Sequence, residues 1–399
     1  MASNSRLPLE VVLTVLDILA QDDQEFLSLK ACSFVCKTFL HQCRKHIFAS
    51  ISVDGRKLVS PKPNTTSLIR LLSTTPEIAD HIRKLVCCIT REEFDRQSLP
   101  GVLEKINKLE FLSIRWPGLE RRWNHNPLRP ALLHLLHLPT LVHLELRKIE
   151  DFEVLDFLPC TNLKELDFSV VKAVESEGAS YLTCSEDPIR LRRFSAGWQW
   201  STTISKLCRT IRPDGRLIID FANVTSVSFH LYERDEHDAA AEFFKHCEQV
   251  TDVVLHVYSP PLTWMGISKT LAPSMQTLTR LSLNISRDES GTADPLSGLV
   301  DELKGIRHQN CIESIIINVY ILPDWDCSSG DDWGRLDEEL TQPGWPKLKS
   351  VLVGITVFTL SREANDLEMA LRKLPETQFP RLSSSKSVVF EFSVAKEFA

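Results

Sequence analysis

Short apolar runs recur along most of the chain, each with apolar residues at its first, fourth and sixth positions. One run begins at Leu109 and continues with Leu112 and Ile114. Full copies start at residues 82, 109, 141, 163, 191, 224, 250, 278, 312 and 348, and a partial copy with Phe390 and Phe392 follows. Such short alternation is typical of a strand with a buried face. The spacing of 22 to 36 residues between starts indicates a repeated supersecondary unit.

Helix-like apolar stretches lie between several of these strands. They are Leu68 to Leu72, Ala131 to Leu138, Ala239 to Phe244, Leu296 to Ile306 and Leu367 to Leu374. One strand and one helix in each unit predict an α/β fold, because such small units must stack to bury their apolar faces. We expect a parallel sheet backed by helices, forming a curved solenoid over residues 65–399. An unrelated fold with alternating strands and helices would fit the same pattern.

The L-x-x-L-x-L core of the copies resembles the leucine-rich repeat over about residues 65–399. That family carries Asn or Cys three positions after the sixth residue, where the side chain satisfies buried backbone groups. This chain has other residues there, such as Pro117, Ile149, Val171 and Ser286. The resemblance therefore implies a leucine-rich-repeat-like solenoid that is irregular rather than uniform.

The segment from Leu9 to Gln21 predicts a helix that is apolar around most of its circumference. Its polar residues fall in a sector about 60° wide, which leaves an apolar arc of roughly 220°, whereas a helix facing one core needs little more than about 100°. One apolar stripe consists of Leu9, Val12, Leu13, Leu16, Leu19 and Ala20. A second stripe consists of Val11, Val15 and Ile18. The second stripe is left for the solenoid to cap or for a partner protein to cover.

A second helix is predicted after a polar break at residues 21–25. Its apolar residues Leu29, Cys32, Val35, Cys36, Phe39, Leu40 and Cys43 repeat at helical spacing. The two helices together carry more apolar surface than about 40 residues can bury among themselves. We therefore predict a small helical module over residues 5–50. Turn residues at Asp54-Gly55 and at residues 60–64 predict a linker over 51–64 before the solenoid.

The ends of this module are similar to the F-box, whose signature begins L-P-x-E and ends near V-C-K-x-[FW]. The matching residues are Leu7-Pro8-Leu9-Glu10, then Leu16 and Leu19, then Val35-Cys36-Lys37-Thr38-Phe39, followed by Arg44 to Phe48. The middle departs from the family, because Asp22 to Glu25 precede Leu27 and Leu29. The resemblance implies a substrate-receptor subunit of an SCF-type cullin-RING ubiquitin ligase. Its F-box would dock a Skp-type adaptor, and through it a cullin, while the repeats hold a protein substrate.

Two sets of binding residues follow. The adaptor-binding set is Leu7, Pro8, Val11, Val15, Ile18, Val35, Cys36 and Phe39. The substrate-binding set combines outward-pointing strand residues with two tryptophans that directly follow strands: Arg115, Trp116, His143, Arg147, Glu165, Asp167, Arg193, Trp198, His230, His256 and Arg280. A protein-interaction scaffold with the same repeats and no role in ubiquitin ligation is the alternative function.

The composition excludes several classes of protein. The chain has 399 residues, 43% of them apolar, and a net charge of -7, which argues against disorder and against binding nucleic acid or an anionic membrane. No apolar run approaches the roughly 20 residues that span a bilayer. The eleven cysteines show no disulfide framework, so we expect reduced thiols and a cytoplasmic or nuclear location.

No motif for catalysis or for a cofactor stands out. Cys32, Cys36, Cys43 and His46 are the residue types that bind zinc, but on one helix they form a stripe and cannot surround an ion. Phosphate-binding glycine motifs and the G-x-S-x-G motif are absent. We therefore expect a binding protein that is not an enzyme and has no metal or cofactor. An enzyme that uses the Cys/His cluster remains the contrasting hypothesis.

Overall fold

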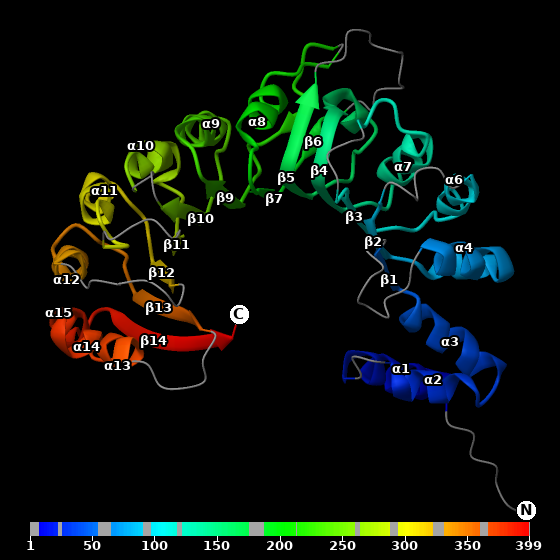
Figure 1. Ribbon diagram of the computed structural model, residues 1–399, viewed down its shortest axis with the longest axis horizontal. Coiled ribbons are helices and arrows are strands. Elements are labelled where there is room, and N and C mark those ends of the chain that lie inside the picture. The colour runs from blue at the N-terminus through cyan, green and yellow to red at the C-terminus, as the bar shows by residue number, and fades with distance from the viewer. Residues whose placement is uncertain are drawn as a thin grey trace, which may run out of the picture. The chain divides into compact units, whose positions relative to one another are not determined.

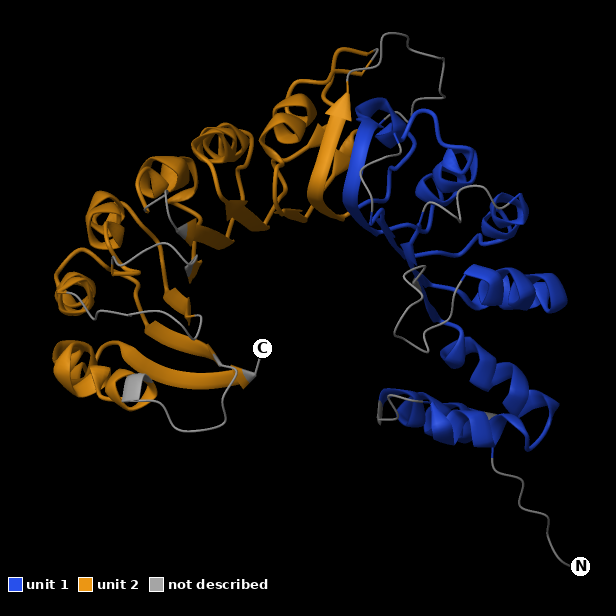
Figure 2. Cartoon of the chain, in the orientation of Figure 1, with its two compact units in different colours: residues 1–163, 176–187 blue, residues 164–175, 188–399 orange. Residues whose placement is uncertain are grey.

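The computed structural model describes residues 8–22, 26–54, 65–90, 97–117, 122–174, 187–212, 214–259, 264–287, 294–321, 331–359 and 366–398. The chain divides into two compact units (Figure 2). Unit 1 comprises residues 1–163 and 176–187, and unit 2 comprises residues 164–175 and 188–399. Among the described residues, no helix has the length and apolarity needed to cross a membrane.

Unit 1 begins with three helices and continues with parallel strands that alternate with helices (Figure 1). Its elements are α1 (Leu9–Asp22), α2 (Leu27–Ser33), α3 (Lys37–Ile47), β1 (Ser50–Asp54), α4 (Thr65–Thr74), η1 (Pro76–His81), β2 (Lys84–Cys88), α6 (Ser98–Leu103), β3 (Phe111–Arg115), α7 (Arg129–Leu136), β4 (His143–Glu153) and η2 (Val154–Phe157). Strands β1, β2, β3 and β4 pair in that order. Helices α4, α6 and α7 lie along one side of them.

Helices α1 to α3 have a small core of their own. Leu16, Leu29 and Cys43, one from each helix, are buried together. Partly buried residues that pack around them are Val12, Leu19, Ala20, Phe26, Cys32, Phe39 and Ile47. The first predicted stripe of α1 therefore supplies this core. The prediction of one continuous second helix was wrong. The backbone of Cys36 is extended, with φ −163° and ψ 171°, and separates α2 from α3.

The helical module is joined directly to the sheet of unit 1. Strand β1 pairs with β2, with Ile51 opposite Leu85, so residues 51–54 of the predicted linker form a strand. The remaining residues of that linker, 55–64, lie outside the described residues. The carbonyl of Ala49 accepts backbone hydrogen bonds from Arg83 and Lys84, and Arg44 of α3 forms an ion pair with Glu77. These contacts fix α3 against the start of the sheet.

Unit 2 is a longer series of parallel strands, with helices α8 to α12 along one side (Figure 1). Its elements are β5 (Glu165–Val174), β6 (Ile189–Arg190), β7 (Arg193–Ala196), α8 (Ser201–Leu207), β8 (Ile219–Asp220), β9 (Ser226–Leu231), α9 (Arg234–Phe244), β10 (Asp252–Ser259), α10 (Ile267–Leu271), η3 (Ala272–Ser274), β11 (Arg280–Arg287), α11 (Leu299–Ile306), β12 (Ser314–Ile321), α12 (Asp332–Thr341), β13 (Ser350–Thr359), α13 (Asp366–Leu371), α14 (Leu374–Thr377), α15 (Pro380–Ser384) and β14 (Val389–Phe398). The main strands pair in the order β5, β7, β9, β10, β11, β12, β13 and β14. Strands β6 and β8 form a separate small pair.

A repeated hydrogen-bond pattern sets the register at the start of each strand. The carbonyl of Thr225, for example, accepts from the backbone N–H groups of Thr251 and Asp252. The carbonyl of Thr251 accepts in the same way from Thr279 and Arg280. Each copy of the repeat begins two residues before its strand. The hydrogen bonds therefore keep neighbouring copies in register, so that their apolar residues lie side by side.

The core of unit 2 lies between the strands and the helices. Buried strand positions such as Leu281, Leu283 and Ile285 alternate with polar residues on the opposite face. Aromatic rings thicken the core near β7 and β9, where Phe194 stacks on Phe243 with ring centroids 4.9 Å apart. The expectation of parallel strands backed by helices is therefore confirmed. The strands predicted from the repeat are all present, whereas β1, β6 and β8 were not predicted.

Carboxylates on the helices tie neighbouring units of the repeat together. Glu302 of α11 accepts hydrogen bonds from the backbone N–H groups of Gly266 and Ser268, both at 2.8 Å. Asp337 of α12 accepts from the backbone of Arg381 and Leu382. These acceptors, half-buried at Glu302 and buried at Asp337, satisfy N–H groups that would otherwise lack partners at the first turns of α10 and α15.

Candidate functional site

The second stripe of α1 is exposed, as the sequence predicted. Val11, Val15 and Ile18 have 44%, 49% and 51% of their surface exposed, although all three are branched apolar residues. The neighbouring Leu16 is fully buried in the core of the helical module. Helix α1 thus uses one face for its own fold and presents an apolar face to solvent.

The turn between α2 and α3 adds two exposed apolar residues, of which the sequence analysis selected Val35 but not Phe34. Phe34 is 89% exposed, and Val35 and Leu27 are also largely exposed. Phe34 falls outside the helical stripe that continues through Val35 and Phe39, so periodicity gave no reason to select it. We name Val11, Val15, Ile18, Phe34 and Val35 the apolar surface of the helical module. Large exposed apolar groups gathered in one small module mark an interaction site more often than a solvent face.

The other predicted adaptor-binding residues differ in how far they are exposed. Pro8 and Cys36 are exposed, whereas Phe39 is half-buried and packs on the core of the helical module. Leu7 lies outside the described residues. A contact between His46 Nε2 and Asp17 Oδ1, at 3.0 Å, joins α3 to α1 and helps hold the module in shape.

The predicted substrate-binding residues of unit 1 lie on the uncovered face of the sheet, with one exception. Arg115 pairs in register with Arg147, and both are half-buried. His143 packs against Phe111, and Arg147 lies 3.5 Å from Glu145. Trp116 is buried and stacks on Trp123, so the assignment of Trp116 to the substrate-binding set was wrong. Its large aromatic ring instead contributes to the core of unit 1.

In unit 2 the predicted charged residues pair with one another across strands. Arg193 lies 3.6 Å from Glu165, and Arg280 lies 3.1 Å from Asp252. Asp167 is half-buried on the same face. These ion pairs neutralise much of the charge on this face of the sheet. The shape of the face and its aromatic side chains are then the features that can distinguish one ligand from another.

A row of in-register polar side chains crosses β9 to β12. His230 stacks on His256 with ring centroids 4.2 Å apart, and His256 Nδ1 lies 3.5 Å from Asn284 Nδ2. Asn318 donates to Asn284 Oδ1 at 2.7 Å. Burial lowers the pKa of His256, because desolvation disfavours the charged imidazolium. The two predicted histidines thus belong to a row joined by ring stacking and hydrogen bonds.

Three exposed or half-exposed aromatic rings lie at the carboxyl ends of β7, β9 and β10. Trp198 is 47% exposed and packs edge to face with Tyr232 at 5.1 Å. Tyr232 in turn stacks on Tyr258 at 4.2 Å. We name Trp198, Tyr232 and Tyr258 the aromatic cluster. Only Trp198 was predicted, although both tyrosines follow the predicted His230 and His256 by two positions and so share their face.

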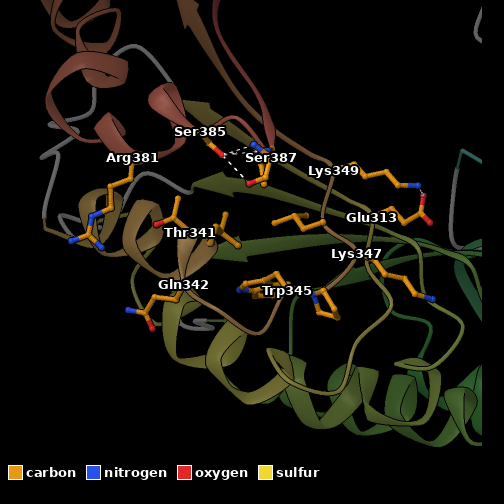
Figure 3. A pocket seen from close by; sticks show the side chains of 13 residues that line it. Glu313, Thr341, Gln342, Trp345, Lys347, Lys349, Arg381, Ser385 and Ser387 are labelled. Carbon is orange, nitrogen blue, oxygen red and sulfur yellow. Dashed lines mark hydrogen bonds and ion pairs between the residues drawn. The ribbon is translucent and has the colours of Figure 1, made fainter.

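A cavity of about 630 Å³ opens near the amino ends of β13 and β14 (Figure 3). Lys347, Lys349 and Arg381 line it, but Lys349 is paired with Glu313 at 2.7 Å and Arg381 with Glu338 at 3.2 Å. Ser385 accepts from the backbone of Ser387 and Val388. The polar groups here satisfy one another and do not converge on an open point.

Two buried titratable groups lie away from the exposed surfaces. Asp156 accepts from Trp123 Nε1 at 2.6 Å and from Arg129 at 2.9 Å, and burial raises its pKa. His237 of α9 is buried with no hydrogen-bond partner on either ring nitrogen, and desolvation lowers its pKa. Within the described ranges, no group of three or more His, Cys, Asp and Glu residues is arranged to hold a metal ion.

Comparison with known proteins adds no assignment to this geometry. The sequence matches none of the protein-family models and none of the curated proteins with which it was compared. The candidate site of this chain is therefore defined by its own residues: the apolar surface of the helical module and the polar and aromatic face of the sheets.

Proposed function

We propose that the helical module docks on another protein through its apolar surface, and that the repeats bind a second protein. With the resemblance of residues 5–50 to the F-box, the first partner is a Skp-type adaptor, which attaches to a cullin. The chain then acts as the substrate receptor of an SCF-type ubiquitin ligase. Residues 65–399 form the leucine-rich-repeat-like part that binds the substrate.

The observation that carries the proposal is the division of α1 into two apolar faces. Leu16 points into the core of the module, while Val11, Val15 and Ile18 stay about half exposed. A cap formed by the chain's own repeats would have buried these three side chains. Their exposure is what a face reserved for another protein requires.

The size of the surface is consistent with a protein partner of substantial area. Because Val11, Val15 and Ile18 are about half exposed, burial of their remaining surface contributes about 2–4 kcal/mol in total. This is less than the free energy that association costs. Phe34 and Val35 supply the additional apolar contact, and a large aromatic side chain is the residue type that most often dominates an interface.

A receptor of this kind needs no bond chemistry of its own. By holding a substrate close to an activated ubiquitin carrier, it raises the effective concentration of the substrate's lysines. The paired charges on the sheet faces and the aromatic cluster are groups suited to binding.

The test is co-expression of the full chain with a Skp-type adaptor, followed by size-exclusion chromatography and titration calorimetry. We expect a stable complex that both Val15→Asp and Phe34→Ala disrupt. The first places an unpaired carboxylate in an apolar interface, and the second removes a large apolar contact. Met369→Asp is the matched control, since Met369 is also exposed and apolar but lies in α13.

Adaptor binding that survives Val15→Asp, or that never occurs with the wild-type chain, would overturn the adaptor assignment. The repeats would then be those of an interaction scaffold without a role in ubiquitin ligation. Circular dichroism of each variant checks that the helical module is still folded.

A further inference from the structure

A cavity of about 540 Å³ lies beside the aromatic cluster in unit 2. Its lining comes from the ends of β5 and β7, the start of α8, and the start of α9. The residues are Lys172, Trp198, Gln199, Ser201, Thr202, Tyr232, Glu233, Asp235 and Glu236. We name this cavity the Trp198 pocket.

The backbone after β7 is shaped so that Trp198 faces the pocket. Gly197 lies so close to Ser169 that a Cβ atom there would be 2.6 Å from Ser169 Oγ. Gln199 has a φ of +53°, in the left-handed region that costs a residue with a side chain about 1 kcal/mol or more. This turn breaks the alternation of the strand, so that Trp198 is exposed while Trp200 is buried against Phe229.

The buried carboxylate of Glu236 holds the strained turn at Gln199 in place. Gln199 donates its backbone N–H to Glu236 Oε1 at 3.1 Å, and the backbone N–H groups of Tyr232 and Glu233 donate to Oε2. One side chain thus fixes the segments that carry both exposed rings, Trp198 and Tyr232. Backbone strain of this kind clusters at active sites and ligand-binding segments.

The charge of the lining is negative. Glu233, Asp235 and Glu236 contribute carboxyl groups, against the single ammonium group of Lys172. Glu236 is occupied by the backbone, whereas Glu233 and Asp235 are exposed at the rim. Asp235 also accepts from the hydroxyl of Ser201 at 2.7 Å, which fixes its carboxylate toward α8.

Aromatic faces beside exposed carboxylates attract one kind of group above others. The face of Trp or Tyr attracts a cation through its quadrupole, and a planar guanidinium can stack on the ring while it donates to carboxylates. A neutral apolar ligand would use the rings and leave the carboxylates without a role. An anionic ligand would be repelled by them.

We propose that the Trp198 pocket binds an arginine side chain presented by a protein partner. The guanidinium stacks on the exposed ring of Trp198, which packs edge to face on Tyr232. Its N–H groups donate to Glu233 and Asp235. Tyr258 supports the site by stacking on Tyr232 and by packing edge to face with Trp198, with ring centroids 6.0 Å apart. This inference rests on the proposed function in one respect, because the arginine belongs to the protein that the repeats bind.

The experiment titrates the full chain with N-acetyl-arginine methylamide and, as the neutral isostere, N-acetyl-citrulline methylamide. The readout is the indole N–H resonance of Trp198 in two-dimensional NMR, identified by its loss in Trp198→Phe. We expect a saturable shift with the arginine ligand and an affinity for citrulline that is about tenfold weaker. The double variant Glu233→Gln, Asp235→Asn should weaken arginine binding by about tenfold as well.

Met265→Ala is the matched control, since Met265 is exposed in unit 2 but does not line this pocket. Equal binding of arginine and citrulline, or no shift of the Trp198 resonance up to the solubility limit of the ligand, would overturn the proposal. The titration uses no adaptor, and Val15→Asp should bind the arginine ligand normally. Failure here is therefore distinguishable from failure of adaptor docking.

Discussion

The backbone N–H of Gln199 donates to the buried carboxylate of Glu236, which lies 37 residues later in the chain. Glu236 receives two further N–H groups from the segment that begins α9. Because all three donors come from the backbone, the contact fixes the path of the chain irrespective of the side chains on it. The Trp198 pocket thus depends on one acidic residue of α9.

Replacement of Glu236 by alanine should lower the free energy of unfolding by about 2–4 kcal/mol, because three backbone donors lose their buried acceptor. Chemical denaturation of the two proteins measures the difference. Glu242→Ala, on the same helix but half-exposed and within reach of Lys245 and His246 at the surface, should change it by less than about 1 kcal/mol. Equal effects of the two substitutions would show that Glu236 does not have this role.

Adjacent residues of α1 should respond in opposite ways to truncation. Leu16→Ala opens a cavity among Leu29 and Cys43 and should destabilise the helical module by about 2–5 kcal/mol. Val15→Ala should leave its stability within about 0.5 kcal/mol, since its side chain is half exposed. Hydrogen exchange of residues 8–48 separates the two outcomes. A large loss of protection in Val15→Ala would mean that this face is covered by the chain itself.

The stability of unit 2 should depend on pH through His237. Burial lowers the pKa of this imidazole, so the unfolded chain binds a proton at a pH where the folded chain does not. Stability therefore falls as the pH drops below about 6.5, the unfolded value. Melting temperatures at pH 7.5 and 5.5 should differ more for the wild type than for His237→Gln, which cannot titrate. An identical pH dependence in both proteins would contradict this assignment.

Asp156 should be the most sensitive carboxylate in unit 1. Asp156→Ala removes the acceptor of Trp123 Nε1 and a partner of Arg129, and should cost about 3–5 kcal/mol. Glu153→Ala removes a more exposed partner of the same arginine and should cost about 1 kcal/mol or less. Thermal unfolding monitored by tryptophan fluorescence distinguishes the two, because Trp123 is next to the change.

Much of the fold could be predicted because the residues that define the repeat are the buried apolar residues of the strands. Leu112 and Ile114, or Leu281 and Leu283, have a partner at the same position in the next strand, so one pattern predicts many strands. Strand β1 was missed because its two apolar residues, Ile51 and Val53, stand in a turn-rich segment. The break in the second helix was missed because helical spacing continued across Cys36 although the backbone did not.

The surfaces were harder to predict than the strands. Exposure of Val11, Val15 and Ile18 followed from an excess of apolar residues around one helix, which is a local property. The orientation of Trp198 was not local, because it depends on the left-handed backbone of Gln199 and on the carboxylate of Glu236. Trp116 also follows a strand directly, yet it is buried, so the position of a tryptophan in the repeat does not decide its exposure.

The helix carboxylates that accept backbone N–H groups have an evolutionary consequence. Glu302 contacts Gly266 and Ser268 mainly through their main-chain atoms, and Asp337 does the same with Arg381 and Leu382. The loops that receive these contacts can accept many mutations, provided that a single acidic residue on each helix is retained. Divergent descendants of this chain could therefore vary the loops at the ends of their strands, and with them the ligands they bind, while keeping the same stack of repeats.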